Sequence, residues 1–258
     1  MTGAVPARPP RVAVAGVPFD PVTERQAVER VAAALGAGEG GHLVTPNVDI
    51  CRAVARDPAL KELVSGADLV VADGMPLVWA SRLLREALPE RVTGADLIWS
   101  LSAMAARGGW PVYLLGGPPG VAARAEWELA NRCHGLRVCG VDAPPYGFDR
   151  SDEGVARVRE QLVAARPAIV FVGLGFPLQD RLIAGLRPEL PRTWFVGCGS
   201  AIAFAAGSVA RAPLWMRRSG TEWLFRLASE PGRLARRYLV DDVPFATRLL
   251  TRSLLLRR

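Results

Sequence analysis

Apolar runs of strand length alternate with segments of helical period along most of the chain. Seven runs predict β-strands: Val12–Val17, Leu43–Thr45, Leu69–Ala72, Val112–Leu115, Leu136–Val141, Ile169–Val172 and Trp194–Val196. Most positions in these runs are apolar, without the polar alternation of a strand that has one face in water. This pattern is typical of a parallel sheet that is covered by helices on both faces.

The segments between these runs have the period of amphipathic helices. A capping box, Thr23 with Gln26, begins the first of them. Further helices are expected over 48–56, 75–85, 95–106, 119–132, 152–164 and 177–186, with Thr93 to Asp96 as a helix cap. The alternation predicts the α/β class, with a doubly wound, mostly parallel, Rossmann-like sheet over residues 11–210. Residues 1–10, which hold three prolines, are expected to be a disordered lead-in and not a signal peptide.

The pattern changes after Arg211, where three helices and no strand are expected, over 215–228, 232–240 and 244–256. Residues 211–258 contain 11 arginines and 4 acidic residues, whereas residues 1–210 are neutral, so this appendage carries the whole net charge of +7. Large apolar residues and arginines share the same helices, which favours a helical appendage lying on an anionic membrane surface. A helical cap folded onto the core and a nucleic-acid-binding tail are the alternatives; no RNA or DNA motif supports the latter.

The composition limits the other classes of function. Four cysteines lie far apart without a C-x-x-C pair, which indicates reduced thiols in a cytosolic protein. Neither of the two histidines has metal-ligand neighbours, and no metalloprotease, serine-hydrolase or P-loop motif occurs. The uncharged window from Thr193 to Ala210 is rich in Gly and Ala, so it is interpreted as a strand, a turn and a helix. A membrane span is the less favoured interpretation.

Candidate chemistry lies where the predicted strands end, because ligands of open α/β sheets bind at the carboxyl ends of the strands. Thr45 and Asn47 follow the second strand, and Asp73 follows the third. Glycines that let backbone N–H groups approach a phosphate follow two later strands: Gly116, Gly117, Gly120, Gly173 and Gly175. Such glycines also serve turn geometry alone. The absence of G-x-G-x-x-G argues against a dinucleotide oxidoreductase.

Asp73 has two interpretations. Its position before Gly74, Met75 and Pro76 suits the cap of a helix that begins near Met75, and the local pattern alone favours this role. Alternatively, a partly dehydrated carboxylate at a cleft is a general base that takes a proton from a hydroxyl group.

A resemblance that covers nearly the whole chain favours the second interpretation. The matching blocks are TPNVDI (45–50), ADGMPLVW (72–79), RVTGADL (91–97), VYLLGGPPG (112–120), VGLGFPLQD (172–180) and RAPLWMRRSGTEWLFRLASEPGRLARRYL (211–239). In these blocks the chain resembles the WecG/TagA/CpsF family, glycosyltransferase family 26. The resemblance implies transfer of a sugar, typically N-acetylmannosamine, from a UDP donor to a polyprenyl-diphosphate-linked sugar in cell-surface polysaccharide synthesis. Relatives transfer glucose or other sugars.

The resemblance also implies roles for single residues. Asp73 would be the general base, Thr45 and Asn47 would line the donor-sugar pocket, and Arg91 would lie near the diphosphate. Gln179 would bind the donor, whereas Arg226, Arg233 and Arg236 would close over the site and meet the diphosphate. Glu222 is expected to be structural and paired with a nearby arginine.

These assignments agree with the chemistry of glycosyl transfer, which needs a base on the acceptor and positive charge on the departing UDP. Arginines meet phosphate oxygens through paired N–H bonds. We therefore expect an inverting hexosyltransferase without a cofactor, and without a metal since no Asp-x-Asp motif occurs. The expected partners are the UDP-sugar, the lipid-linked acceptor, an anionic membrane surface and a second subunit, but no nucleic acid. The expected location is cytoplasmic, peripheral on the inner face of the cell membrane.

One block departs from the family. Where members usually have Phe-Asp after the last strand, this chain has Ile202 and Ala203, and that Asp would help to hold the donor nucleotide. Ser200 is the nearby polar group that could replace it. A catalytically impaired relative that acts as an assembly scaffold is therefore the alternative to an active enzyme.

Overall fold

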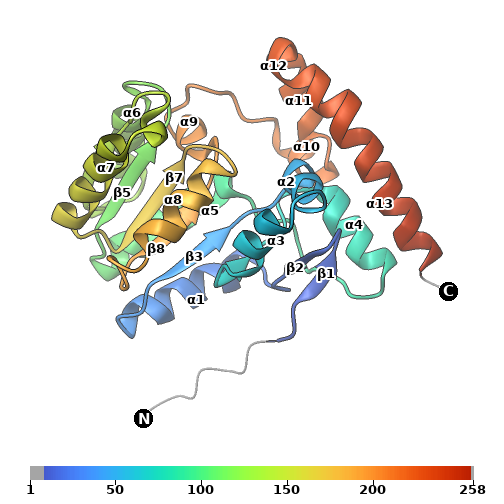
Figure 1. The fold of residues 1–258 in the computed structure, drawn as a ribbon, viewed down its shortest axis with the longest axis horizontal. Helices are drawn as coiled ribbons and strands as arrows, with labels where there is room; N and C mark the ends of the chain where they lie inside the picture. The colour runs from blue at the N-terminus through green and yellow to red at the C-terminus, as the bar shows by residue number, and fades with distance from the viewer. Residues whose placement is uncertain (1–8, 257–258) are drawn as a thin grey trace.

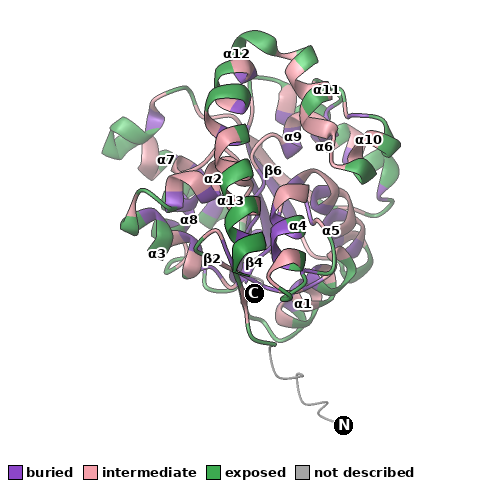
Figure 2. Ribbon diagram, turned by 90° about the vertical axis from the view of Figure 1, so that its right-hand side faces the viewer, coloured by how far each residue is buried: buried purple, intermediate pink, exposed green. Residues whose placement is uncertain are grey.

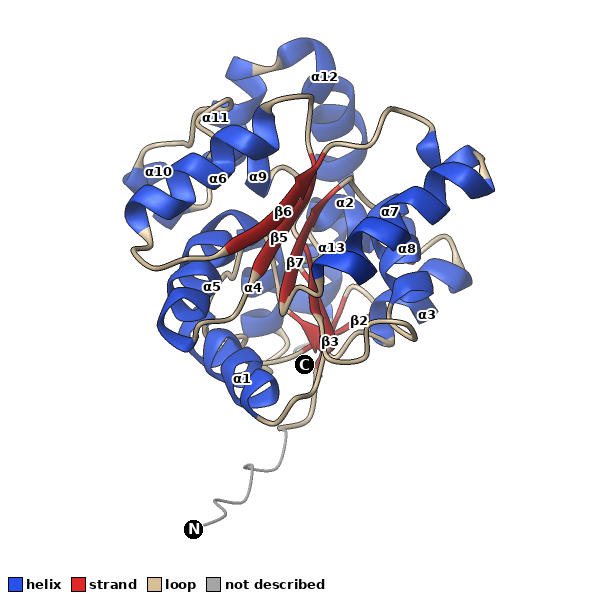
Figure 3. Cartoon of the chain, turned by 90° about the vertical axis from the view of Figure 1, so that its left-hand side faces the viewer, coloured by secondary structure: helices blue, strands red, loops and turns tan. Residues whose placement is uncertain are grey.

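The centre of the molecule is a six-stranded parallel sheet. The structure, a computed structural model, describes residues 9–256, so most of the expected lead-in over residues 1–10 lies outside the described residues. The strand order is β4-β3-β8-β7-β5-β6 (Figure 3). The strands are β3 (Gly41–Val44), β4 (Leu69–Val70), β5 (Val112–Gly116), β6 (Val138–Asp142), β7 (Ile169–Gly173) and β8 (Trp194–Gly197). The sheet confirms the α/β class, and six of the seven predicted strands correspond to it.

The first predicted strand, 12–17, is wrong as a single strand. It is a hairpin of β1 (Val12–Val14) and β2 (Val17–Phe19), which pair antiparallel outside the main sheet. Ala15 and Gly16 form the turn, with φ of 53° and 79°. Two successive residues with positive φ match the twist of a tight hairpin. Only Gly16 marked this turn within an otherwise apolar run.

Helices cover both faces of the sheet (Figures 1 and 3). Leu114 and Phe171 share one core with α1 (Glu24–Gly36), α5 (Gly94–Gly108), α6 (Val121–Arg132) and α9 (Ala201–Ala205). The neighbouring positions Leu115 and Val172 share another with α7 (Asp152–Ala165) and α8 (Leu178–Leu186), beside η1 (Phe148–Arg150). Strand residues therefore alternate between two apolar cores, as the unbroken apolar runs predicted.

The helix starts follow local polar signals. Thr23 and Gln26 form the predicted capping box, and Thr93 caps α5 by accepting a hydrogen bond from the Asp96 N–H. A short helix that the sequence analysis missed, α3 (Pro58–Ser65), begins at the Asp57 cap and packs beside α2 (Val48–Val54). Proline at the first turn of α3 costs no helical hydrogen bond. The uncharged window 193–210 contains β8, a turn and α9, as expected.

The C-terminal segment, defined here as residues 211–256, folds over one end of the sheet (Figure 1). Its helices are α10 (Leu214–Ser219), α11 (Glu222–Ser229), α12 (Pro231–Ala235), the π-helical η2 (Arg236–Asp242) and α13 (Val243–Leu255). The first predicted helix is broken at Gly220, where φ is 76°. The expected break before Pro244 is absent, because η2 continues directly into α13 and Pro244 occupies the first turn of that helix.

Packing of α13 joins this segment to the body. Phe245, Leu249 and Leu250 lie against the apolar core formed by the β1–β2 hairpin, α2, α3 and α4 (Met75–Leu83). Other large apolar residues of the C-terminal segment remain exposed (Figure 2): Leu214, Trp215, Leu224, Leu239, Val240, Val243, Leu254, Leu255 and Leu256. Among residues 9–256, no helix has the length and apolar character needed to cross a membrane.

The contact between the ends of β5 and β7 generates a prediction. Gly116 has φ of 114°, and a Cβ there would lie 2.6 Å from the Gly173 carbonyl oxygen. We expect Gly116→Ala to lower the free energy of unfolding by about 3 kcal/mol, because backbone strain and a clash with main chain add together. Gly120→Ala is the matched control, since Gly120 has φ of 79° and open space around it, and should cost about 1 kcal/mol. Urea unfolding measures both; equal losses would contradict the clash.

Candidate active site

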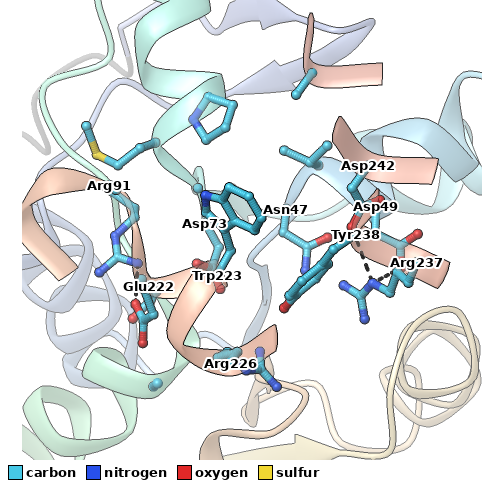
Figure 4. A pocket seen from close by; sticks show the side chains of 18 of the residues that line it. Asn47, Asp49, Asp73, Arg91, Glu222, Trp223, Arg226, Arg237, Tyr238 and Asp242 are labelled. Carbon is cyan, nitrogen blue, oxygen red and sulfur yellow. Dashed lines mark hydrogen bonds and ion pairs between the residues drawn. The ribbon is translucent and has the colours of Figure 1, made fainter. Parts of the chain in front are cut away.

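A cavity of about 190 Å³ lies between the carboxyl ends of β3 and β4 and the C-terminal segment (Figure 4). One wall comes from the body of the protein and includes Asn47, Asp49, Asp73, Arg91 and Thr93. The other wall comes from Phe204 and from the C-terminal segment, and includes Arg211, Glu222, Trp223, Arg226, Arg237, Tyr238 and Asp242. The cavity therefore exists because the C-terminal segment lies over this end of the sheet.

Asp73 lies at the carboxyl end of β4 and faces the cavity. Its backbone N–H donates to the Pro46 carbonyl at 3.0 Å, which ties the loop after β4 to the loop after β3. The capping interpretation is not supported, since Gly74 occupies the cap position of α4 and no side chain caps that helix. Among the described residues, none donates a hydrogen bond to the Asp73 carboxylate. This carboxylate is therefore left for a ligand.

The surroundings of Asp73 favour a proton acceptor that works near neutral pH. Burial raises its pKa from 3.8 to about 6, the Arg91 guanidinium opposes this rise, and the negative charges of Glu222 and Asp96 add to it. Above this pH the carboxylate is ionised and can take a proton from a hydroxyl group. A general base is most effective when its pKa lies near the working pH.

A chain of charges fastens α11 to the body at one end of the cavity. Arg91 Nη1 donates to Glu222 Oε2 at 2.7 Å, and Glu222 Oε1 lies 3.4 Å from Arg211 Nε. Arg211 Nη2 lies 3.1 Å from Asp96 Oδ1 at the start of α5. Glu222 is thus paired as expected, and with two arginines. These alternating charges hold Arg91 beside Asp73 without a direct ion pair between the two.

A second set of charges fastens η2 to α2 at the other end. Arg237 Nε lies 3.0 Å from Asp49 Oδ2 and 3.5 Å from Asp242 Oδ2. Arg52 contacts Asp49 at 2.6 Å. Burial raises the pKa of Asp242 to about 6, with the Asp49 charge adding to the rise and the two arginines opposing it.

Arg226 supplies positive charge to the cavity wall. Its guanidinium lies 5.3 Å from the centre of the Phe204 ring, and that of Arg211 lies 5.4 Å from the same ring. Contacts between a guanidinium and an aromatic ring orient the cation without neutralising it. The nearest carboxylate oxygen to Arg226, Glu230 Oε1, is 3.9 Å from Nη2. Most of the donors of Arg226 are therefore left for a ligand.

The structure brings Asp73, Asn47, Arg91 and Arg226 together in this cavity, but not every predicted residue. Thr45 is buried, and its hydroxyl donates to the Gly197 carbonyl at 3.2 Å. Gln179 is also buried, and its side-chain oxygen accepts from the Gly199 N–H at 3.2 Å. Neither lines the cavity, and both instead fix the end of β8.

The other predicted residues also lie outside the cavity lining. Arg233 contacts Glu230 at 2.6 Å, and Arg236 is exposed. The five glycines, Gly116, Gly117, Gly120, Gly173 and Gly175, belong to the ends of β5 and β7 and the turns after them, whereas the cavity lies at the ends of β3 and β4. Their role toward a phosphate remains a prediction.

The sequence analysis missed several residues of the cavity: Asp49, Phe204, Arg211, Trp223, Arg237, Tyr238 and Asp242. Most of them belong to the TPNVDI block or to the block over 211–239. The second block is specific for the family as a whole, but its sequence does not indicate which side chains face the cavity. An aromatic residue in an amphipathic helix has the same pattern whether it faces a core, a lipid or a cavity.

The chain is similar in sequence to known glycosyltransferases over most of its length. Residues 12–258 match the model described as the glycosyl transferase WecG/TagA/CpsF family. A protein of Bacillus subtilis, named N-acetylglucosaminyldiphosphoundecaprenol N-acetyl-beta-D-mannosaminyltransferase, is 29% identical over 197 residues, which cover 76% of this chain and 75% of the relative. A protein of Bacillus spizizenii with the same name is 30% identical over 202 residues, which cover 78% and 76%.

The raised pKa of Asp73 generates a prediction about stability. An acid whose pKa rises on folding binds its proton more tightly in the folded chain, so the folded state loses stability as the pH rises from about 4 to about 6. We expect Asp73→Asn to increase the free energy of unfolding at pH 7.5, by up to about 3 kcal/mol. The gain should vanish below pH 4. Urea unfolding at both pH values measures it, and a mutant less stable than wild type at pH 7.5 would indicate a structural role instead.

Proposed function

We propose a function from the premise that this chain belongs to the WecG/TagA/CpsF family of glycosyltransferases. It transfers a hexose, N-acetylmannosamine or a close relative, from a UDP-sugar to a sugar linked to polyprenyl diphosphate. The names of the two bacterial relatives support this choice of sugar and of acceptor, with N-acetylglucosamine as the acceptor sugar. The product would serve cell-surface polymer synthesis.

The observation that carries the proposal is an ionisable carboxylate, Asp73, facing a cavity whose wall contains arginines. In the reaction, Asp73 takes the proton of the acceptor hydroxyl as the hydroxyl oxygen bonds to the anomeric carbon of the donor. The bond from that carbon to the diphosphate oxygen breaks, and its electron pair leaves with UDP. This single displacement inverts the anomeric configuration, because the nucleophile enters opposite the leaving group.

Arginines neutralise the charge that develops on the departing UDP. Arg226 is held over Phe204 with most of its donors unused, and Arg91 lies in the same cavity. Two parallel N–H bonds from a guanidinium match the oxygens of a phosphate. These cations support a mechanism without a metal, in which the C-terminal segment supplies part of the catalytic charge.

The same segment supports a peripheral location on the membrane. Exposed apolar residues of η2 and α13, among them Leu239, Val240 and Leu254–Leu256, share these helices with Arg248 and Arg252. Apolar side chains beside cations suit an anionic lipid surface. On this proposal residues 11–210 are the catalytic domain and residues 211–258 are the membrane-facing appendage. The protein lies on the cytoplasmic face of the membrane, and the acceptor reaches Asp73 from the membrane.

The central prediction concerns Asp73. With a polyprenyl-diphosphate-linked N-acetylglucosamine, a panel of UDP- and GDP-sugars should show nucleotide release with a UDP-hexosamine. Asp73→Asn should lower this turnover by about 10²–10⁴-fold. For wild type, kcat/KM should rise with pH toward about 6 and then level off, because the base must be ionised. Asp142→Asn is the control, since Asp142 ends β6 at the opposite edge of the sheet.

Equal rates for wild type and Asp73→Asn would remove the base role from Asp73. No release by wild type with any donor would favour the alternative raised by Ala203, a catalytically impaired relative that acts as an assembly scaffold.

A further prediction concerns the leaving group. Arg226→Ala should lower kcat at least about tenfold, because a charge-assisted bond to the diphosphate is lost. Arg233→Ala, whose side chain is held by Glu230 outside the cavity lining, should change kcat less than Arg226→Ala does. Turnover should persist in EDTA, and nuclear magnetic resonance of the product should show the inverted anomer. Loss of turnover in EDTA that Mg²⁺ restores would contradict the metal-independent mechanism.

A further inference from the structure

Two aromatic side chains in the cavity have no part in the mechanism above. Trp223 comes from α11 and Tyr238 from η2, and both line the cavity that Asp73 faces (Figure 4). Their ring centres are 6.3 Å apart and their planes are nearly perpendicular, at 86°. Tyr238 is buried and Trp223 is half-buried, so the pair forms a fixed aromatic corner of a cavity that both apolar and charged residues line.

Unused hydrogen-bonding groups surround this aromatic corner. Within the described part of the chain, the Tyr238 hydroxyl has no hydrogen-bond partner. The Asn47 side-chain oxygen accepts from the Ile50 N–H at 3.0 Å, which leaves its amide nitrogen to donate to a ligand. Asp242 is buried and both of its oxygens face arginines, with Oδ2 3.5 Å from Arg237 Nε and Oδ1 3.7 Å from Arg52 Nε. The Tyr238 hydroxyl and the Asn47 amide nitrogen lack such partners within residues 9–256, and polar groups without partners in a cavity point to a polar ligand.

An aromatic corner beside polar groups matches the surface of a pyranose ring. One face of such a sugar presents C–H groups, which pack against the electron-rich face of an aromatic ring. The hydroxyl groups of the sugar lie around its edge and need hydrogen-bond donors and acceptors. Trp223 and Tyr238 supply the first kind of contact, and the Tyr238 hydroxyl and the Asn47 amide supply the second.

The size of the cavity limits what it holds. Its volume is about 190 Å³, whereas pockets that bury drug-sized ligands have roughly 300–1,000 Å³. The cavity therefore has room for a sugar ring, and the nucleoside of the donor would extend beyond it, with the diphosphate beside Arg91 and Arg226.

The origin of the aromatic pair indicates which sugar it meets. Both rings come from the C-terminal segment, and the exposed apolar residues Leu239 and Val240 directly follow Tyr238 in η2. A sugar carried by a lipid would approach from this side. We propose that Trp223 and Tyr238 form the platform for the terminal sugar ring of the lipid-linked acceptor. The Tyr238 hydroxyl and the Asn47 amide bind the edge of this ring, so Asn47 serves the acceptor and not the donor sugar that the resemblance implied. The inference rests on the proposed function, which defines the acceptor.

Steady-state kinetics with two variants of Trp223 test this platform. The probe is N-acetylglucosamine linked through a diphosphate to a farnesyl chain. In Trp223→Leu the KM for this acceptor should rise at least tenfold, while the KM for the UDP-sugar changes less than twofold. Trp223→Phe keeps an aromatic face and should restore the acceptor KM to within about threefold of wild type. Tyr238→Phe keeps the ring, removes only the hydroxyl, and should raise the acceptor KM about threefold to tenfold.

A matched ligand separates sugar recognition from recognition of lipid or phosphate. Farnesyl diphosphate has the chain and the diphosphate but no sugar, so its inhibition constant should change less than twofold in Trp223→Leu. An equal loss for both ligands would overturn the platform, as would an unchanged acceptor KM or a change confined to the KM of the donor. Should Trp223→Leu fail to fold, Tyr238→Phe decides by the same readouts.

A direct binding measurement tests the aromatic platform even if the protein transfers no sugar. Saturation-transfer nuclear magnetic resonance should show the pyranose protons of the farnesyl-linked probe receiving magnetisation from wild type, and much less from Trp223→Leu. If wild type transfers no sugar but this signal is present, the proposed function fails and the platform stands. If wild type transfers sugar and the signal does not depend on Trp223, the platform fails and the function stands.

Discussion

The partial removal of one carboxylate, Asp73, from water is the constraint on which the rest of the site depends. A charge that leaves water is disfavoured unless opposite charge lies near it, and here burial outweighs the opposing arginines and raises the pKa of Asp73 to about 6. A fully exposed carboxylate would be a weaker base, and a deeply buried one without arginines would remain protonated at neutral pH. The C-terminal segment sets this balance because it supplies both the cover and Arg226.

Holding such a segment in place requires more than apolar packing. α13 packs through Phe245, Leu249 and Leu250 at one side of the cavity. α11 and η2 are also joined to the body by ion pairs, from Glu222 to Arg91 and from Arg237 to Asp49. Isolated ion pairs at a protein surface contribute little. Here the ion pairs within each set share residues: Glu222 binds both Arg91 and Arg211, and Arg237 binds both Asp49 and Asp242. Shared residues fix the side chains of Arg91, Glu222 and Arg237 around the cavity.

The sequence predicts the body of the fold better than it predicts the cavity. Continuous apolar runs identify all six strands of the sheet, because a strand buried on both faces tolerates few polar residues. The β1–β2 hairpin was missed because its turn needs only Ala15 and Gly16. The position of Asp73 followed from the end of β4. Thr45 likewise follows β3, and Gln179 lies in the first turn of α8 after β7. Their side chains instead satisfy backbone groups of β8 and its turn, and no pattern in the sequence separates them from Asp73.

On the proposed function, one site must serve two substrates that differ strongly in chemistry. A lipid-linked sugar and a soluble nucleotide sugar must meet at one pair of atoms, although their remaining parts need different surroundings. The carboxyl edge of the sheet offers backbone N–H groups at the glycine turns after β5 and β7, which suit phosphates. The C-terminal segment offers aromatic faces and exposed apolar side chains, which suit a sugar on a lipid. Asp73 lies in the loop after β4, the strand next to β3, where these two surfaces converge. On the proposed function it would act there on the acceptor while the donor remains bound to the sheet.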